Sequence, residues 1–529
     1  MREIRFELNS GTGYEKSNSP VNNNSRSGSQ CWRVKPALKK RSSARVGIER
    51  SPKPEIPELY FVRMRSFLHF CLAVVTCLPS MPQGLSFGSM QARTEPAWMS
   101  KVTIYELWLN AFSKEGTLKG AIPGLKHIAD LGALVVYLGP IAKRSATPHS
   151  SPYNIADYNA IDPQYGSEAD LHAFVKEAHR LGLKVMLDLV YYHTAPNGVM
   201  MQHPEWLVHT SDGQIARGFW PQPLPEFTNP KVRDYLIDSM VHWVRDFGVD
   251  GFRCDVGAGV PVTFWEQARQ ALDKVNRDVI LLSEADRPDD QLHAFDISYN
   301  FRGFLTLRSV IRDGISAFNI RKEWEQTNRE YPEGARLLRF DDNHDWRRAV
   351  LEYGDKGAYA AAVLNFTLDG VPFLYNGQEF GDCTPTHWLT NAPIEWPHPS
   401  DRTDRKVPEE TLAKYKRLFA IRNQHPALQS GELTWINNTE PVNVLSFLRT
   451  EATERILVVV NLSNRNTHLT VDLPVMEYSS VNDLLTDGKK YFQLYSGRVS
   501  MDLSAYEPLV GTQIPLAPLT QSPQARPLK

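Results

Sequence analysis

The sequence has few cysteines and no surplus of charge of either sign. Of its five cysteines, only Cys254 and Cys383 lie in the part of the chain that the hydrophobic pattern predicts to be folded, so a disulfide framework is not expected. The 59 Lys and Arg residues nearly balance the 60 Asp and Glu residues. This balance removes the electrostatic attraction that draws basic proteins to nucleic acids and anionic membranes. We therefore expect a neutral partner and no nucleic acid.

Long apolar runs are scarce as well. The run from Phe67 to Leu78 spans about 12 residues, which is too short to cross a bilayer, so no stable membrane insertion is expected. Because the run follows Met64 and Arg65, it is typical of the core of a secretory signal peptide. We predict a signal peptide over residues 64–92, with translation starting near Met64, and a secreted or periplasmic protein. The alternatives are a buried or interfacial segment and a cytoplasmic protein.

The two ends of the chain offer no pattern from which a folded core could be built. Residues 1–63 are rich in Ser, Asn, Lys and Arg and have neither helical nor strand periodicity. Burial there could not offset the entropy lost on ordering the chain. We therefore predict disorder for residues 1–63 and for the tail at residues 516–529.

Between these ends, short apolar runs alternate with amphipathic stretches. The alternation is typical of βαβ units, and there are more units than a single open sheet usually holds. We predict an α/β fold with a (β/α)8 TIM barrel over residues 100–426. The strand-like runs are Val102–Leu109, Leu134–Leu138, Lys184–Val190, Gly251–Cys254, Val279–Ser283, Arg336–Phe340 and Val371–Tyr375. The helical spans include Gly124–Leu131, Glu168–Leu181, Val232–Phe247 and Thr263–Val275.

Two segments depart from this rhythm. A short inserted subdomain at about residues 194–227 is expected after the third strand, because the spacing there exceeds one βα unit by about 35 residues. After Pro426 the apolar runs shorten and are interrupted by Asn, Ser and Gly turns, as at Val444–Leu448 and Ile456–Val460. This change predicts a C-terminal antiparallel β domain over residues 432–515.

Polar clusters follow four of the predicted strands, at the face where barrel enzymes build their active sites. The clusters are Asp188–His193, Gly251–Asp255, Ser283–Ala285 and Phe340–Asp345, at strands 3, 4, 5 and 7. About 29 residues separate Asp255 from Glu284, which is close to the length of one βα unit. We therefore expect these two carboxyls on adjacent strands.

A pair of carboxyls on adjacent strands fits the cleavage of a glycosidic bond. One carboxylic acid must protonate the leaving oxygen, and retaining enzymes place a second carboxylate about 5 Å away to attack the anomeric carbon. Arg253 precedes Asp255 by two residues, so both should share a face of the strand, where the guanidinium would keep Asp255 ionised. Glu284 follows the apolar segment Ile280–Ser283, a setting expected to raise its pKa toward that of a general acid.

Taken one at a time, these residues have plainer structural explanations. The alternatives are an ion pair for Arg253 and Asp255, a turn or helix cap for Asn343–Asp345, an exposed strand end for Glu284, and core packing for His193 and Tyr153. The order and spacing of the clusters along the chain favour the catalytic interpretation over all of these.

In these clusters, from about Val102 to about Gln513, the chain resembles the α-amylase family of retaining glycoside hydrolases, glycosyl hydrolase family 13. The segments Leu224–Pro230 and Gly370–Glu379 match the family as well. The resemblance implies that Asp255 is the nucleophile, Glu284 the acid/base and Asp345 the stabiliser of the transition state. It implies further roles around the cleaved sugar: Tyr153 as a stacking platform, Asp188 as a support for Arg253 and the nucleophile, and His193, Arg253 and His344 as substrate contacts.

Two departures from the family concern calcium. Tyr192 stands where many calcium-dependent members have an asparagine that helps to bind the ion, and a tyrosine is a poor calcium ligand. Ala258 and Gly259 replace a Lys-His pair that often follows the nucleophile. We therefore predict no metal, no conserved calcium site and no other cofactor.

The leading functional hypothesis is an α-amylase-like hydrolase that acts on maltooligosaccharides or starch-type α-1,4-glucans by double displacement. A transglycosylase or an isomerase of the trehalose-synthase type would use the same three carboxyls. A non-catalytic member associated with a transporter is a third hypothesis, which the intact carboxyls Asp255, Glu284 and Asp345 disfavour. The expected partner is an α-glucan or a maltooligosaccharide, and the oligomeric state is not predicted.

Overall fold

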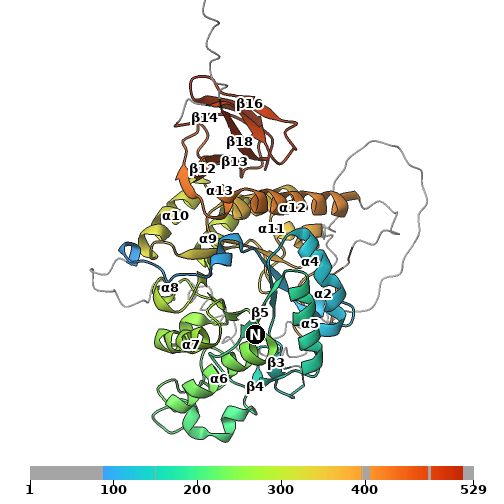
Figure 1. Ribbon diagram of the computed structural model, residues 1–529, viewed down its shortest axis with the longest axis vertical. Helices are drawn as coiled ribbons and strands as arrows, with labels where there is room; N and C mark the ends of the chain where they lie inside the picture. Colours follow the sequence, from blue (N-terminus) through green and yellow to red (C-terminus); the bar gives the residue numbers. More distant parts are fainter. Residues whose placement is uncertain (1–86, 149, 395, 397–405, 475–477, 516–529) are drawn as a thin grey trace, which may run out of the picture. The chain divides into compact units, whose positions relative to one another are not determined.

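The computed structural model describes residues 87–148, 150–394, 396, 406–474 and 478–515 (Figure 1). The segments predicted to be disordered lie outside these residues, and so does the predicted signal peptide up to residue 86. Its last residues are described: Phe87–Ser89 form a 3-10 turn, and Gln91 forms a bridge with Glu333. Export of the protein stays a prediction. Within the described ranges, no helix is both long and apolar enough to pass through a membrane.

Parallel strands close into a barrel at the centre of the described chain. Going around the barrel, the strands are β1 (Ile104–Leu107), β2 (Val135–Leu138), β5 (Lys184–Leu189), β6 (Gly251–Cys254), β7 (Ile280–Ser283), β8 (Ile297–Ser298), β9 (Arg336–Arg339) and β10 (Val371–Tyr375). Nearly all their residues are buried, because helices cover the outside and side chains fill the inside. The predicted α/β barrel with its antiparallel C-terminal β domain is therefore confirmed.

Helices connect these strands (Figure 1). In chain order they are α2 (Leu109–Phe112), α3 (Leu118–Ala121), α4 (Leu125–Leu131), α5 (Glu168–Arg180), α6 (Pro230–Phe247), α7 (Val262–Val275), α8 (Asp290–His293), α9 (Phe301–Arg308), α10 (Phe318–Glu330), α11 (Ala349–Thr367), α12 (Lys406–Gln424) and α13 (Pro426–Gln429).

Local sequence sets the ends of α6. Asn229 caps the N-terminus by accepting a hydrogen bond from the N–H of Lys231, and Gly248 ends the helix at φ 72°, where glycine carries no steric penalty.

Two short elements of the barrel domain have no clear sequence signal. β8 is only two residues long, so it shows no periodicity that sequence reasoning could detect. The hairpin of β3 (Ala142–Arg144) and β4 (Ile155–Ile161) lies between β2 and α5. Its connecting loop carries Tyr153 toward the interior of the barrel mouth, where this ring is only 7% exposed.

The segment of about residues 194–227, after β5, contains little regular structure. It includes the 3-10 turns η4 (Val199–Gln202) and η5 (Pro204–Trp206). Isolated antiparallel bridges, such as Leu207 with Pro225 and Arg217 with Pro223, fold the rest back on itself. The excursion therefore stays close to the barrel mouth from which it leaves.

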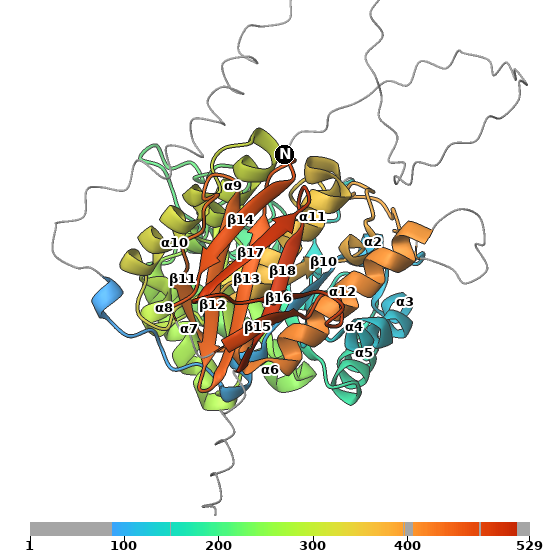
Figure 2. The same ribbon diagram turned by 90° about the horizontal axis from the view of Figure 1, so that it is seen from above.

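The C-terminal strands form antiparallel sheets (Figure 2). The larger sheet has the order β11 (Glu432–Trp435), β12 (Val444–Glu451), β13 (Glu454–Asn461), β18 (Pro508–Pro515), β15 (Tyr478–Asp483) and β16 (Tyr491–Gln493). The smaller sheet pairs β14 (Thr467–Asp472) with β17 (Arg498–Leu503). Along β13, Ile456, Val458 and Val460 pack into the core shared with the barrel, whereas Leu457 and Val459 pack into the core of the C-terminal domain. Both faces of this strand are buried, so its sequence reads as an unbroken apolar run.

Candidate active site

The register of the barrel strands brings the predicted carboxyls together. Asp188 on β5 lies opposite Arg253 on β6, and Cys254 on β6 lies opposite Ser283 on β7. Asp255 and Glu284 each follow one of these last two residues, so they leave neighbouring strands at the same level. Their predicted adjacency, inferred from a spacing of one βα unit, is confirmed.

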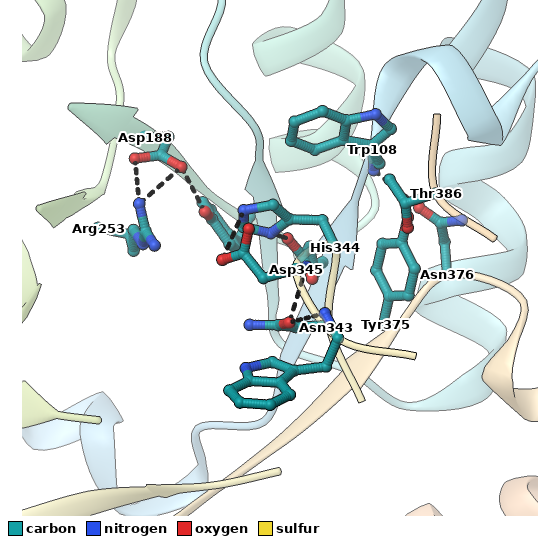
Figure 3. Close-up of polar contacts among 12 residues, drawn as sticks. Trp108, Asp188, Arg253, Asn343, His344, Asp345, Tyr375, Asn376 and Thr386 are labelled. Atoms are coloured by element: carbon teal, nitrogen blue, oxygen red, sulfur yellow. Dashed lines mark hydrogen bonds and ion pairs between the residues drawn. The ribbon is translucent and has the colours of Figure 1, made fainter. Parts of the chain in front are cut away.

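Arg253 is the centre of the charge network in the barrel mouth, and its contacts with Asp188 are drawn in Figure 3. The guanidinium is fully buried, and its Nη1 donates to both oxygens of Asp188, at 2.9 and 3.1 Å, and to Oδ1 of Asp255 at 2.8 Å. Its Nη2 forms an ion pair of 2.5 Å with Oε1 of Glu284. One guanidinium therefore contacts three carboxylates, including both members of the predicted catalytic pair. The contact with Glu284 was not predicted from the sequence.

Asp188 supports Arg253 as expected and is itself held by two tyrosines. The hydroxyl of Tyr137 donates to Oδ2 at 2.6 Å, and the hydroxyl of Tyr153 donates to the same oxygen at 3.0 Å. These bonds add to those from Arg253 and fix the carboxylate in place. Tyr153 thus has a polar role that the sequence did not indicate, and its role as a stacking platform for the sugar stays a prediction.

The ring of Tyr153 lies in a stack of flat side chains. The ring of Trp108 is 4.9 Å from that of His344 at an interplanar angle of 8°, and Tyr153 is 5.8 Å from His344 at 16°. The backbone N–H of Trp108 donates to Oδ1 of Asn376 at 2.8 Å, which fixes the stack to the end of β10 (Figure 3). These side chains form one wall of the barrel mouth.

His344 is a buried cation between acidic groups. Its Nδ1 contacts Oε1 of Glu106, its Nε2 lies 2.6 Å from the hydroxyl of Tyr153, and Nε2 lies 3.3 Å from Oδ2 of Asp345. Burial alone would lower the pKa of His344, but the charges of Asp345 and Glu106 outweigh it and raise this pKa to about 9. The imidazolium can therefore donate from both nitrogens at neutral pH.

Asp345 is the most exposed of the three predicted catalytic carboxyls, with 30% of its side chain accessible. Its backbone N–H donates to Oδ1 of Asn343 at 2.9 Å, so Asn343 does form the local turn that was the structural alternative for this segment (Figure 3). The turn and the functional interpretation are compatible, because the turn presents Asp345 toward His344 and the open mouth of the barrel.

The catalytic pair is buried, and this controls its protonation. Burial raises the pKa of Asp255, repulsion from Glu284 raises it further, and Arg253 lowers it. Burial also raises the pKa of Glu284, against the lowering effect of Arg253. The direction predicted for Glu284 is confirmed. The prediction that Arg253 keeps Asp255 ionised is wrong for the free protein, because burial and Glu284 outweigh Arg253 and raise the pKa of Asp255 well above its usual value. A buried pair of this kind tends to retain one proton, which leaves one acid and one carboxylate.

The backbone next to Asp255 is strained. Val256 has φ 47° and ψ 48°, a left-handed conformation that β-branched residues rarely adopt. In this conformation its N–H donates to Oε2 of Glu284 at 2.8 Å. The left-handed backbone at Val256 therefore allows a hydrogen bond that fixes Glu284 relative to the strand that carries Asp255.

His193 is buried and neutral. Its Nε2 lies 2.9 Å from the carbonyl oxygen of Tyr153, and burial lowers the pKa of His193 to about 4. The ring of Trp220, from the excursion after β5, lies 5.4 Å from that of His193. His193 therefore links the loop of Tyr153 to the excursion after β5, and its role as a substrate contact stays a prediction.

Sequence reasoning missed several residues of this site. They are Glu106, Trp108, Tyr137, Tyr299 and Trp388, of which Tyr299 lies 5.7 Å beneath the guanidinium of Arg253 and Trp388 lies 5.1 Å from Tyr153. One signal was available: Glu106 is a lone carboxylate inside an apolar strand, and a buried carboxylate needs a cationic or donor partner.

The prediction that the family's calcium site is missing rests on Tyr192, and the structure shows what surrounds its ring. The ring of Tyr192 lies between Gly218 and Gly259, so close that a Cβ at either glycine would overlap it. Trp220 packs 5.9 Å from the same ring. Across the described residues, no group of three or more His, Cys, Asp or Glu side chains is arranged to hold a metal ion. An aromatic ring therefore fills the space between Gly218 and Gly259.

The raised pKa of His344 predicts a pH-dependent contribution to stability. Since the pKa rises from about 6.5 in the unfolded chain to about 9, this contribution is full below pH 6.5 and disappears as the pH rises through 9. The shift corresponds to roughly 3 kcal/mol. The unfolding free energies of the wild type and of His344→Gln, measured in urea, should therefore differ more at pH 6 than at pH 9.5. A difference that stays constant over this range would contradict the assignment.

Comparisons with known proteins address the family. The sequence model described as "Alpha amylase, catalytic domain" matches residues 86–206 and 215–404. An α-amylase of Haloarcula japonica is 28% identical over 417 residues, which cover 75% of this chain and 60% of the relative. A cyclomaltodextrinase of Geobacillus thermopakistaniensis is 28% identical over 377 residues, covering 66% of this chain and 62% of the relative. The chain thus spans about three fifths of the length of these two relatives.

The fold has solved counterparts. The crystal structure of a maltogenic α-amylase from Thermotoga neapolitana superimposes with a TM-score of 0.71 at 29% sequence identity, covering 79% of this chain and 99% of that one. An α-amylase from Lactobacillus plantarum gives a TM-score of 0.68 at 26% identity, covering 79% and 100%. The sequence match extends over the barrel from its first strand to its last, and the family inferred from the four polar clusters is confirmed: this chain belongs to the α-amylase family.

Proposed function

We propose that this chain is a retaining glycoside hydrolase that cleaves α-1,4-glucosidic bonds in maltooligosaccharides or starch-type glucans. Relatives named α-amylase and cyclomaltodextrinase support this class of substrate. The observation that carries the proposal is the contact of Asp255 and Glu284 with one guanidinium, that of Arg253. Carboxyls held on the same cation lie close together, which suits direct attack on the sugar better than the wider separation that inverting enzymes need for a water.

The first step would form a covalent intermediate. Glu284 donates its proton to the glycosidic oxygen while a carboxylate oxygen of Asp255 attacks the anomeric carbon. The bond between that carbon and the glycosidic oxygen breaks, so the shorter glucan leaves with a free hydroxyl. The remaining sugar is then a β-linked glucosyl ester of Asp255. Burial of Glu284 favours its protonated form, which this step requires.

The second step would release the sugar. Glu284, now a carboxylate, removes a proton from water, and the water oxygen attacks the anomeric carbon. The ester bond breaks and restores the carboxylate of Asp255. Two inversions at the same carbon give net retention. In both steps Arg253 holds the charge of Asp255 in place, and the transition-state charge on the sugar faces the exposed carboxylate of Asp345.

Removing either member of the pair should abolish turnover of maltoheptaose. We expect Asp255→Asn and Glu284→Gln each to lower kcat by at least about 10³-fold, since the residues act as one unit. Asp238→Asn, which changes an exposed carboxyl on α6, is the matched control and should keep wild-type activity. Products are followed by chromatography, and circular dichroism checks folding.

Analysis of the products formed from maltoheptaose and from maltose separates the alternative activities. Full activity of Asp255→Asn would refute the mechanism. Accumulation of trehalose from maltose would replace hydrolysis by isomerisation, and products longer than maltoheptaose would indicate transglycosylation on the same pair.

We also propose that the protein works without a bound calcium ion. The position in question is filled by Tyr192, whose ring is enclosed by Gly218 and Gly259 and joins the excursion after β5 to the loop after β6. In this arrangement, aromatic packing fixes the excursion to the barrel, which is the task that an ion would otherwise perform.

Chelation should therefore leave the protein unaffected. We expect the melting temperature and the rate on maltoheptaose to be the same in EDTA and in millimolar calcium. Tyr192→Ala should lower the melting temperature because it opens a cavity between the two glycines, whereas Tyr192→Phe keeps the ring and should match the wild type. Loss of activity in EDTA that calcium restores would overturn the proposal.

A further inference from the structure

Glu106 is a carboxylate on β1 with no exposure to solvent. Its Oε1 contacts Nδ1 of His344, whereas its Oε2 has no hydrogen-bond partner among the described residues. A buried carboxylate oxygen without a partner costs free energy, so its presence in a folded protein calls for an explanation. The neighbours of Glu106 on β1, Tyr105 and Leu107, are equally buried and carry no charge. Packing alone therefore gives no reason for a carboxylate at this position.

The contacts of His344 require a proton on each ring nitrogen. The hydroxyl of Tyr153 donates its proton to Oδ2 of Asp188, so its oxygen accepts from Nε2 of His344, 2.6 Å away. On the other side of the ring, an ionised Glu106 can only accept, so Nδ1 must donate. A neutral imidazole has a single N–H and could make only one of these two bonds. The hydrogen-bond geometry therefore indicates an imidazolium.

The polar groups that face this imidazolium come from separate parts of the chain. Glu106 lies on β1, Tyr153 in the loop of the β3–β4 hairpin, and Arg253 on β6, while Asp345 directly follows His344. Burial disfavours the cation, Asp345 and Glu106 favour it, and Arg253 disfavours it, which together raise the pKa of His344 to about 9. Uncharged rings cover the rest of the imidazole, namely those of Trp108 and Trp388.

The two carboxylates that favour the cation have different surroundings. Asp345 has 30% of its side chain exposed and lies beside the ring of His344 (Figure 3), where it is open to a sugar. Glu106 has no exposed surface, so a sugar cannot contact it. Its charge is also less screened by water than that of Asp345. Glu106 is therefore the partner whose charge acts on His344 throughout the reaction.

We propose that Glu106 is a positioning residue for the cleavage of the glycosidic bond: it holds His344 so that both ring nitrogens donate, and His344 thereby orients Asp345. The proton on Nε2 serves both Tyr153 and Asp345, whose oxygens lie 2.6 and 3.3 Å from that nitrogen. Without the charge of Glu106, burial favours the neutral ring, and one side of the ring loses its bond. The inference rests on the proposed function, because it concerns the same reaction.

A double-mutant cycle tests whether Glu106 acts through His344. Glu106→Gln keeps the size of the side chain and removes its charge, so we expect kcat on maltoheptaose to fall about 10- to 100-fold, with KM changed less than about 3-fold. His344→Gln should cause a loss of similar or larger size. The double variant should be no more than about 2-fold slower than His344→Gln, because the effect of Glu106 needs the imidazole. Losses that multiply would overturn the proposal.

NMR spectra of protein with 15N-labelled histidine report the protonation of His344 independently of activity. In the wild type at pH 7 we expect both ring N–H signals of His344, identified by their absence in His344→Gln, and titration of the ring near pH 9. In Glu106→Gln the ring should titrate below about pH 7, because burial remains and one of its two carboxylates is gone. The kcat/KM of this variant should accordingly decline at a lower pH than that of the wild type.

Glu379→Gln is the matched control, since Glu379 is also fully buried and lies 2.9 Å from a different histidine, His127. It should leave the titration of His344 unchanged. A single ring N–H on His344 in the wild type at pH 7 would overturn the proposal without requiring any variant to fold, and so would equal titration in Glu106→Gln and the wild type. Failure of the wild type to cleave any α-glucan would instead overturn the proposed function, while the NMR result still stood.

Discussion

The buried guanidinium of Arg253 is the interaction on which the rest of the site depends. A cation without contact with water is costly unless acceptors surround it, and here Asp188, Asp255 and Glu284 supply them. Because these carboxylates come from or directly follow three consecutive barrel strands, their spacing is fixed by the hydrogen bonds between the strands rather than by loops. Removal of Arg253 would leave these buried carboxylates without the cation that they share. The geometry of the pair is thus tied to the stability of the barrel.

Arg253 is also one end of a longer chain of polar contacts. Asp188 accepts a hydrogen bond from Tyr153, and Tyr153 is hydrogen-bonded to His344. His344 in turn forms ion pairs with Glu106 and Asp345. The carboxylates of Asp345 and Glu106 next to the imidazole are the reason that His344 remains protonated although it is buried. The strained backbone at Val256 adds a further constraint on Glu284. The carboxyl that must lose and regain a proton is therefore held from two sides before any sugar arrives.

The sequence predicted those features that depend on spacing along the chain. One βα unit between Asp255 and Glu284 was enough to place them on adjacent strands, and the alternation of apolar runs was enough to predict the barrel. Features that depend on segments distant in sequence could not be predicted. The contact of Arg253 with Glu284 depends on side-chain directions, and the polar role of Tyr153 depends on the path of the β3–β4 hairpin. Glu106 is an intermediate case, since an acidic residue in an apolar strand indicates a buried partner without identifying it.

The central claim is that the carboxylate held by Arg253 at the end of β6 becomes covalently bonded to the sugar. Its most direct test is to trap that bond with a fluorinated glucosyl fluoride, whose ring fluorine slows hydrolysis of the ester, and to map the labelled peptide by mass spectrometry. The account predicts one glucosyl adduct, on the peptide that contains Asp255, and none in Asp255→Asn. An adduct on Glu284 or Asp345, or turnover of the reagent with inversion and no adduct, would contradict it.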